Sequence, residues 1–274
     1  MVAGVEEHYT SAGIVTRVVS AVRAAYGPDV QITPEILSVL DHFHGRGIVA
    51  TREMVALLKP QAGEHILDIG CGIGGPARWI AATFGCHVTG VDLTRAFCEA
   101  AIELNVLTGM SERVRILHGS ALALPVPDRS FDRAYSQNVV MNIPNKREMY
   151  REALRVLKPG GALALSNLCS GANGDPYFPV PWAATPATSF LCSAEQTRAD
   201  LLAEGFEILQ FHDRTQQALA ETIKYRQRLE SAGSPALGVH LILGERMREY
   251  QINSSRSLED GRTTVVEVLA KRPD

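Results

Sequence analysis

The chain has 274 residues, of which 46% are hydrophobic and 21% are charged, a composition typical of a globular protein rather than a disordered or fibrous one. The formal net charge is -3, so no strongly basic surface is expected, which argues against nucleic acid as a partner. The first nine residues contain two glutamates and no apolar run approaches the length of a membrane span, so we expect neither a signal peptide nor a transmembrane helix.

Residues 5–58 are predicted to be helical. Valines recur at helical spacing near the start, and a Gly-Pro pair at 27–28 interrupts the pattern. Thr33 and Pro34 have the residue types that favour the N-cap and the first position of a second helix. A third helix is expected to end at Lys59-Pro60. We therefore expect residues 1–60 to form an N-terminal helical lid segment.

From residue 64 onward, predicted strands alternate with predicted helices, which indicates a parallel, doubly wound α/β sheet. An amphipathic helical stretch at 214–251 interrupts the last part and is expected to form a cap over the site. The expected strands are 65–69, 86–91, 113–118, 131–136, 162–167, 206–212 and 263–270, with helices at about 76–84, 95–108 and 145–157 and another opening at a capping box in 193–196. Residues 61–274 are thus predicted to form one domain with a Rossmann-like sheet of about seven strands.

A glycine-rich loop follows the first predicted strand. Gly70, Gly72 and Gly75 satisfy the G-x-G-x-x-G pattern, in which glycines let the backbone approach a bound ligand closely. Taken alone, this pattern indicates a nucleotide-like cofactor without choosing which one.

Two acidic residues narrow the choice of cofactor. Asp68 comes two residues before the loop, where a fixed negative charge disfavours a pyrophosphate and favours a cationic ligand. Asp92 lies 22 residues after Gly70, close to the spacing expected of an acid that binds a ribose. Two alternatives remain open: Asp68 binds only the loop backbone, and Asp92 caps the helix that follows it.

The chain resembles class I S-adenosylmethionine-dependent methyltransferases. The resemblance lies in four ordered motifs within residues 65–168. Within that family it is most similar to small-molecule enzymes of the sarcosine/dimethylglycine, phosphoethanolamine and tocopherol methyltransferase type, through residues 74–78 and 136–143. The four motifs are Ile-Leu-Asp-Ile-Gly-Cys-Gly-Ile-Gly-Gly at 66–75, Gly-Val-Asp at 90–92, Gly-Ser-Ala at 119–121 and Leu-Lys-Pro-Gly-Gly at 157–161.

This resemblance implies a cofactor, S-adenosylmethionine with S-adenosylhomocysteine as its product, and a sheet that is mostly parallel with an antiparallel last strand. It places the methionine part along Gly70, Gly72 and Gly74. It places the ribose on Asp92 and one adenine face on Leu93. Ser120 departs from the family, which often has an aspartate there, and its uncharged oxygen would accept more weakly. The implied cofactor-binding residues are Asp68, Gly70, Cys71, Gly72, Gly74, Asp92, Leu93, Ser120, Ala121 and Gln137.

The molecule that accepts the methyl group is expected to bind beyond the carboxyl ends of the strands. Gln137, Asn138 and Asn142 follow the fourth strand, and their amides can orient an acceptor without competing as nucleophiles. The alternative for Asn142 is a helix cap or turn contact.

Two histidines are the candidates for a general base. His42 and His44 are two positions apart, so on a helix they would point in different directions and only one would face the site. The alternative for both is a surface or capping role. Together with Gln137 and Asn142 they complete the predicted catalytic set.

A loop rich in aromatic residues and proline spans residues 175–182 and is predicted to wall the substrate pocket, with ordinary packing as the alternative. The five cysteines show neither CxxC nor zinc-site spacing, so we expect free thiols, no metal and a cytoplasmic location. The predicted substrate-binding residues are Tyr9, Phe43, Asn138, Tyr177, Phe178 and Trp182.

We expect methyl transfer to a small molecule, with nitrogen as the acceptor atom by the subgroup resemblance and oxygen or carbon as the near alternative. A nicotinamide-dependent oxidoreductase fits the glycine pattern and Asp92 but leaves Asp68 unexplained. A binding or regulatory protein that kept the fold is a third possibility. The expected partner is the small-molecule substrate, with no nucleic acid and no membrane, and a homodimer is left open.

Overall fold

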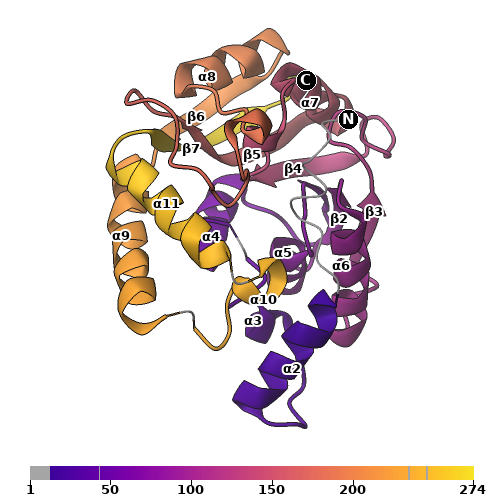
Figure 1. The fold of residues 1–274 in the computed structure, drawn as a ribbon. Coiled ribbons are helices and arrows are strands. Elements are labelled where there is room, and N and C mark those ends of the chain that lie inside the picture. The colour runs from indigo at the N-terminus through magenta and orange to yellow at the C-terminus, as the bar shows by residue number, and fades with distance from the viewer. Residues whose placement is uncertain (1–12, 43, 234, 245) are drawn as a thin grey trace.

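A seven-stranded mixed sheet forms the centre of the molecule (Figure 1). The computed structural model describes residues 13–42, 44–233, 235–244 and 246–274. In the order β3-β2-β1-β4-β5-β7-β6, β7 runs antiparallel to both neighbours and the other pairs are parallel, which confirms the predicted fold class. The strands are β1 (His65–Ile69), β2 (His87–Asp92), β3 (Val114–His118), β4 (Phe131–Gln137), β5 (Leu157–Ser170), β6 (Glu207–Asp213) and β7 (Thr263–Lys271).

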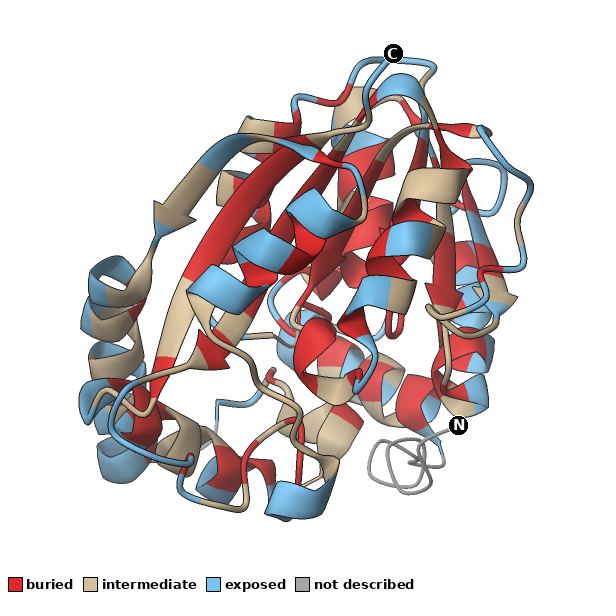
Figure 2. Ribbon diagram, turned by 90° about the horizontal axis from the view of Figure 1, so that it is seen from above, coloured by how far each residue is buried: buried red, intermediate tan, exposed pale blue. Residues whose placement is uncertain are grey.

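Helices cover both faces of this sheet. On one face α4 (Gly47–Leu58), α5 (Gly75–Phe84) and α6 (Arg95–Leu107) pack against strand residues such as Ile66. On the other face α7 (Lys146–Val156) and α8 (Ala194–Ala203) pack against residues such as Leu67. Neighbouring residues of β1 thus face opposite cores, which explains why its sequence is almost continuously apolar. Figure 2 shows the buried strands enclosed between the helices.

The remaining helices gather at one end of the sheet. They are α2 (Ile14–Tyr26) and α3 (Pro34–Leu37) from the N-terminal part, and α9 (Thr215–Ala232), α10 (His240–Leu243) and α11 (Met247–Glu259) from the predicted cap. Ile14 and Ile242 belong to the same hydrophobic cluster, and the side chain of Arg17 donates to the carbonyl of Leu241 at 2.8 Å. The two segments lie side by side although more than 200 residues separate them (Figure 1).

The switch in strand order between β1 and β4 positions the site. Successive strands β1, β2 and β3 extend the sheet in one direction, whereas β4 and β5 extend it in the other. The loops that leave the carboxyl ends of β1 and β4 therefore diverge, and a crevice forms between them.

Three predicted boundaries were wrong. The strand after the helix at 145–157 was expected to span 162–167, but β5 already begins at Leu157, which pairs with Phe131 across an irregular register. At its other end β5 reaches Ser170, because antiparallel pairing with β7 continues to Thr263. The cap was expected to end at 251, but α11 continues to Glu259. Long-range pairing and packing set these ends, and local sequence does not report them.

All five cysteines are free thiols, as predicted. Within the described ranges, no helix is sufficiently long and apolar to cross a bilayer.

Candidate functional site

The glycine-rich loop connects β1 to α5 and bends through left-handed backbone conformations. Gly70, Gly72 and Gly74 have φ of 83°, 53° and 76°, which residues with a side chain rarely adopt. A Cβ atom on Gly70 would lie 2.2 Å from a methyl group of Val139, so a side chain there would collide with the loop that follows β4. Gly70, the first residue after β1, therefore leaves room for the side chain of Val139, which lies just after β4.

Asp68 lies at the carboxyl end of β1 with 2% of its surface exposed. Its Oδ2 accepts a hydrogen bond from the hydroxyl of Tyr135 at 2.8 Å, and burial raises the pKa of the Asp68 carboxyl to about 7. No lysine or arginine among the described residues forms a salt bridge with it. Asp68 binds a side chain rather than the loop backbone, so the alternative weighed for it was wrong.

Asp92 ends β2 and ties two segments together. Its Oδ2 accepts from the backbone N–H of Gly72 and its Oδ1 from that of Thr94, both at 2.8 Å. Burial raises the pKa of this carboxyl as well. The contact with Thr94, the N-cap residue of α6, shows that Asp92 also supports the start of that helix, as the alternative for this residue foresaw.

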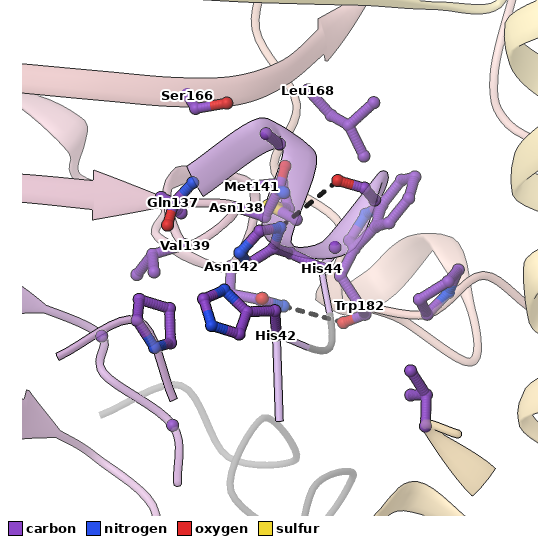
Figure 3. Close-up of a pocket in the computed structure, with 18 of the residues that line it drawn as sticks. His42, His44, Gln137, Asn138, Val139, Met141, Asn142, Ser166, Leu168 and Trp182 are labelled. Atoms are coloured by element: carbon purple, nitrogen blue, oxygen red, sulfur yellow. Dashed lines mark hydrogen bonds between the residues drawn. The ribbon is translucent and has the colours of Figure 1, made fainter. Parts of the chain in front are cut away.

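These acids open onto a cavity of about 640 Å³ that extends from the glycine-rich loop to the cap. The structure brings most of the predicted site residues into its wall, and Figure 3 shows several of them around the same space. The wall residues that were predicted are His42, His44, Asp68, Gly70, Cys71, Gly72, Asp92, Leu93, Ser120, Ala121, Gln137, Asn138, Asn142 and Trp182.

Other predicted site residues lie elsewhere. Gly74 is the N-cap residue of α5 and is not part of the wall. Tyr177 is 37% exposed, donates through its hydroxyl to Asp260 at 2.8 Å and packs under Arg262, while Phe178 packs against the apolar cluster around Trp182. The structure thus places Trp182 alone, of these three aromatic residues, in the wall. Tyr9 and Phe43 lie outside the described residues.

The two histidines converge on Thr51, a residue that the sequence analysis did not single out. The Thr51 hydroxyl donates to Oε1 of Gln137 at 3.2 Å and lies 2.8 Å from Nδ1 of His42 and 3.2 Å from Nε2 of His44. Both histidines line the cavity, so the expectation that only one faces it was wrong. The expectation assumed a helix, but neither His42 nor His44 lies in a helix.

Both imidazoles are neutral at ordinary pH. Burial lowers the pKa of His42 to about 3, helped by the nearby Arg78 guanidinium. Burial, with His42 as a second cause, lowers the pKa of His44 to about 4. A neutral imidazole retains a lone pair that can accept a proton.

Buried charges hold the N-terminal segment in place, and no sequence pattern predicted them. Arg78, fully buried in α5, donates to Asp41 at 2.8 Å and to Asn105 at 3.1 Å. Gly75 leaves no room for a side chain, because a Cβ atom there would lie 2.3 Å from the carbonyl of Asp41. The segment before α4 is therefore packed directly against the start of α5.

Asn142, in the short helix η1 (Val140–Asn142), connects the wall to the aromatic loop. Its side chain donates to the carbonyl of Trp182 at 2.8 Å, the contact drawn in Figure 3. The Trp182 ring is 2% exposed and its Nε1 donates to Ser189 at 2.9 Å. The loop contact that was the alternative for Asn142 is present, and the residue lines the cavity too.

Comparison with known proteins gives a family match in the middle of the chain. Residues 67–165 match the family model described as "Methyltransferase domain". An O-methyltransferase of Aspergillus sclerotiorum, resE, is 34% identical over 60% of this chain and 62% of its own length. The 24-methylenesterol C-methyltransferase 2 of Oryza sativa subsp. japonica is 40% identical over 38% of this chain and 29% of its own. The chain covers less than two thirds of the length of these curated relatives.

A solved structure extends the likeness to almost the whole fold. The phosphoethanolamine N-methyltransferase 2 of Haemonchus contortus, in complex with S-adenosyl-L-methionine, matches with a TM-score of 0.71 at 21% identity. The match covers 93% of this chain and 57% of that one. At this identity the likeness establishes the fold.

Proposed function

We propose, from the premise that this chain carries a class I methyltransferase domain, that it transfers a methyl group from S-adenosylmethionine to a small-molecule acceptor and releases S-adenosylhomocysteine. The observation that carries the proposal is the position of the glycine-rich loop and of two buried acids, Asp68 and Asp92, at one end of a cavity that continues under the cap. The acceptor would occupy the other end.

The charges of the site fit this methyl donor. When bound, the donor supplies an electrophilic methyl group on a sulfonium, and it brings positive charge and no phosphate. Asp68 is buried without a cationic partner among the described residues, so a cationic ligand would relieve an uncompensated acid. A dinucleotide would bring its pyrophosphate against the same carboxyl, which argues against the oxidoreductase alternative.

Different wall residues would contact different parts of the methyl donor, according to their position. The backbone of Gly70, Cys71 and Gly72 would hold the aminoacyl part, and Asp92 would accept from the ribose hydroxyls with lone pairs not used by Gly72 and Thr94. The residues expected around the adenine are Leu93, Ser120 and Ala121, and the Ser120 hydroxyl already accepts from the N–H of Leu122 at 3.1 Å.

Replacing Asp92 tests the cofactor site. Asp92→Ala should weaken S-adenosylhomocysteine binding by about 1–3 kcal/mol, because charged hydrogen bonds are lost. Calorimetry measures the affinity, and Asp29→Ala, at an exposed position, is the matched control. Because Asp92 also holds Gly72, circular dichroism must show that the variant is folded. Unchanged affinity in a folded variant would reject the ribose role.

The acceptor atom expected from the sequence is nitrogen, and it stays a prediction. An amine that arrives neutral needs no base, so Gln137, Asn138 and Asn142 would act by orienting it. A panel of amines and phenols, with S-adenosylhomocysteine release as the readout, tests this choice. Turnover of phenols with none of the amines would reject nitrogen.

A hydroxyl is the second candidate, because the neutral imidazole of His44 lies in the wall. The hydroxyl proton becomes strongly acidic as the new C–O bond forms, and His44 would accept it. His44→Phe should then lower kcat for a hydroxyl acceptor by about 10²-fold or more and leave S-adenosylhomocysteine affinity unchanged. An equal loss with amine and hydroxyl acceptors would point to a structural role instead.

A further inference from the structure

The wall of the cavity opposite the glycine-rich loop is built mainly from apolar side chains of distant segments. We call it the cap wall and define it by Leu168, Trp182, Tyr225, Leu243, Met247 and Leu258. These residues come from β5, the aromatic loop, α9, α10 and α11. A ligand in this part of the cavity is therefore surrounded mostly by carbon.

The described part of this end of the cavity holds no free positive charge. Arg46 is the one arginine or lysine among the described residues of the whole wall. It is fully engaged, because it binds both oxygens of Glu53 at 2.7 and 2.8 Å and an oxygen of Glu221 at 2.8 Å. Glu221 is the one acid from the cap helices among the described wall residues, and because one guanidinium faces two carboxylates, the cluster keeps a net negative charge.

The pairing has a consequence for the acceptor. An anionic group placed against the cap wall would lose its water without gaining a cation, and it would meet the net negative charge of the Arg46 cluster. Both histidines of the wall are neutral, so they do not compensate an anion. The cap wall thus selects against negative charge.

A buried hydroxyl on α11, the helix that also supplies Met247 and Leu258 to the cap wall, lacks a partner within the described part of the chain. Ser255 of α11 lines the cavity with 1% of its surface exposed, and its hydroxyl has no hydrogen-bond partner among the described residues. A buried hydroxyl without a partner is unfavourable, so a ligand oxygen at this point would complete its hydrogen bonding.

We propose that the acceptor is a largely apolar molecule without negative charge, that it carries an oxygen at the end remote from the methyl donor, and that Ser255 recognises this oxygen. That this ligand accepts a methyl group rests on the proposed function. The chemistry of the ligand is inferred from the cavity itself.

The test uses a matched pair of probes, testosterone and testosterone sulfate, which share one apolar skeleton and differ in charge. Each is titrated into the protein with and without saturating S-adenosylhomocysteine, and quenching of tryptophan fluorescence reports binding because Trp182 lies in the wall. We expect testosterone to bind and its sulfate to bind at least about tenfold more weakly. Equal binding of the two, or no binding of testosterone, would overturn the proposal.

Substitution of Ser255 tests its role separately. Ser255→Ala should weaken testosterone binding about three- to tenfold, the effect of one lost hydrogen bond. Ser231→Ala, on an exposed part of α9, is the control and should leave the affinity unchanged. Unchanged affinity in Ser255→Ala would remove Ser255 from the proposal. If the steroid binds but S-adenosylhomocysteine does not, the proposed function fails while the inference about the cavity stands.

Discussion

Asp68 is the residue whose chemistry depends most on what occupies the site. Its carboxyl is buried, accepts from Tyr135, and has a pKa raised to about 7 by burial. Without a ligand it is therefore largely protonated at pH 6 and largely ionised at pH 8. A cationic ligand favours the ionised form, so binding and deprotonation are linked.

This linkage predicts the pH dependence of cofactor binding. Affinity for S-adenosylmethionine should rise between pH 5.5 and 7.5 and then level off, because below pH 7 binding must first remove a proton from Asp68. Calorimetry in two buffers of different ionisation enthalpy measures the released proton. Asp68→Asn is the control and should show a flatter profile. A wild-type profile as flat as that of the variant would contradict the linkage.

At the scale of elements, the contact between the N-terminal segment and α5 shapes the cavity. Arg78 and Asp41 form a buried ion pair with side chains 0% and 1% exposed, and Asp41 and His42 both line the cavity. The segment before α4 is thus held to the start of α5 by charge as well as by close backbone packing. Whether residues 1–60 act as a lid stays a prediction.

Removing only the arginine of this ion pair should lower the stability of the fold. Arg78→Met should lower the free energy of unfolding by about 3–5 kcal/mol, because it leaves the Asp41 carboxyl buried and unpaired. Urea denaturation measures the change. The double variant Arg78→Met, Asp41→Leu removes both charges and should recover part of the loss. A double variant no more stable than Arg78→Met would show that packing, not charge, dominates the contact.

At the scale of the whole molecule, the site exists only in the folded chain, since its wall combines the N-terminal segment, the sheet and the cap. A ligand of this site should therefore stabilise the fold. S-adenosylhomocysteine at about 100 times its Kd should add about 2.7 kcal/mol to the free energy of unfolding. A thermal shift measures this, with NAD as the comparison ligand. A shift with NAD and none with S-adenosylhomocysteine would favour the oxidoreductase alternative.

The family resemblance read from the sequence is confirmed by the methyltransferase-domain match over residues 67–165 and by the sheet order. Relatives that transfer methyl groups to oxygen and to carbon both match, so the choice of nitrogen stays a prediction. The cytoplasmic location, the homodimer and the absence of a nucleic-acid partner also stay predictions.

The sequence alone determined the end of the cavity that we propose binds the cofactor. Its residues belong to one strand–loop–helix unit and the strand after it, so short-range spacing and strand patterns are sufficient to predict their arrangement. They are Asp68, Gly70, Gly72 and Asp92. Parallel strands then bring the two acids to the same edge of the sheet, so the fold class predicts that they lie close to each other.

Only the tertiary structure decided the other end of the cavity, which we propose binds the acceptor. Arg46 meets Glu221 across 175 positions, Thr51 meets Gln137 across 86, and Ser255 joins the wall from a third segment. Periodicity reports which face of a segment is apolar, but which segments meet depends on packing of the whole chain. For the same reason the unpartnered Ser255 hydroxyl and the full engagement of Arg46 became visible only once the chain was folded.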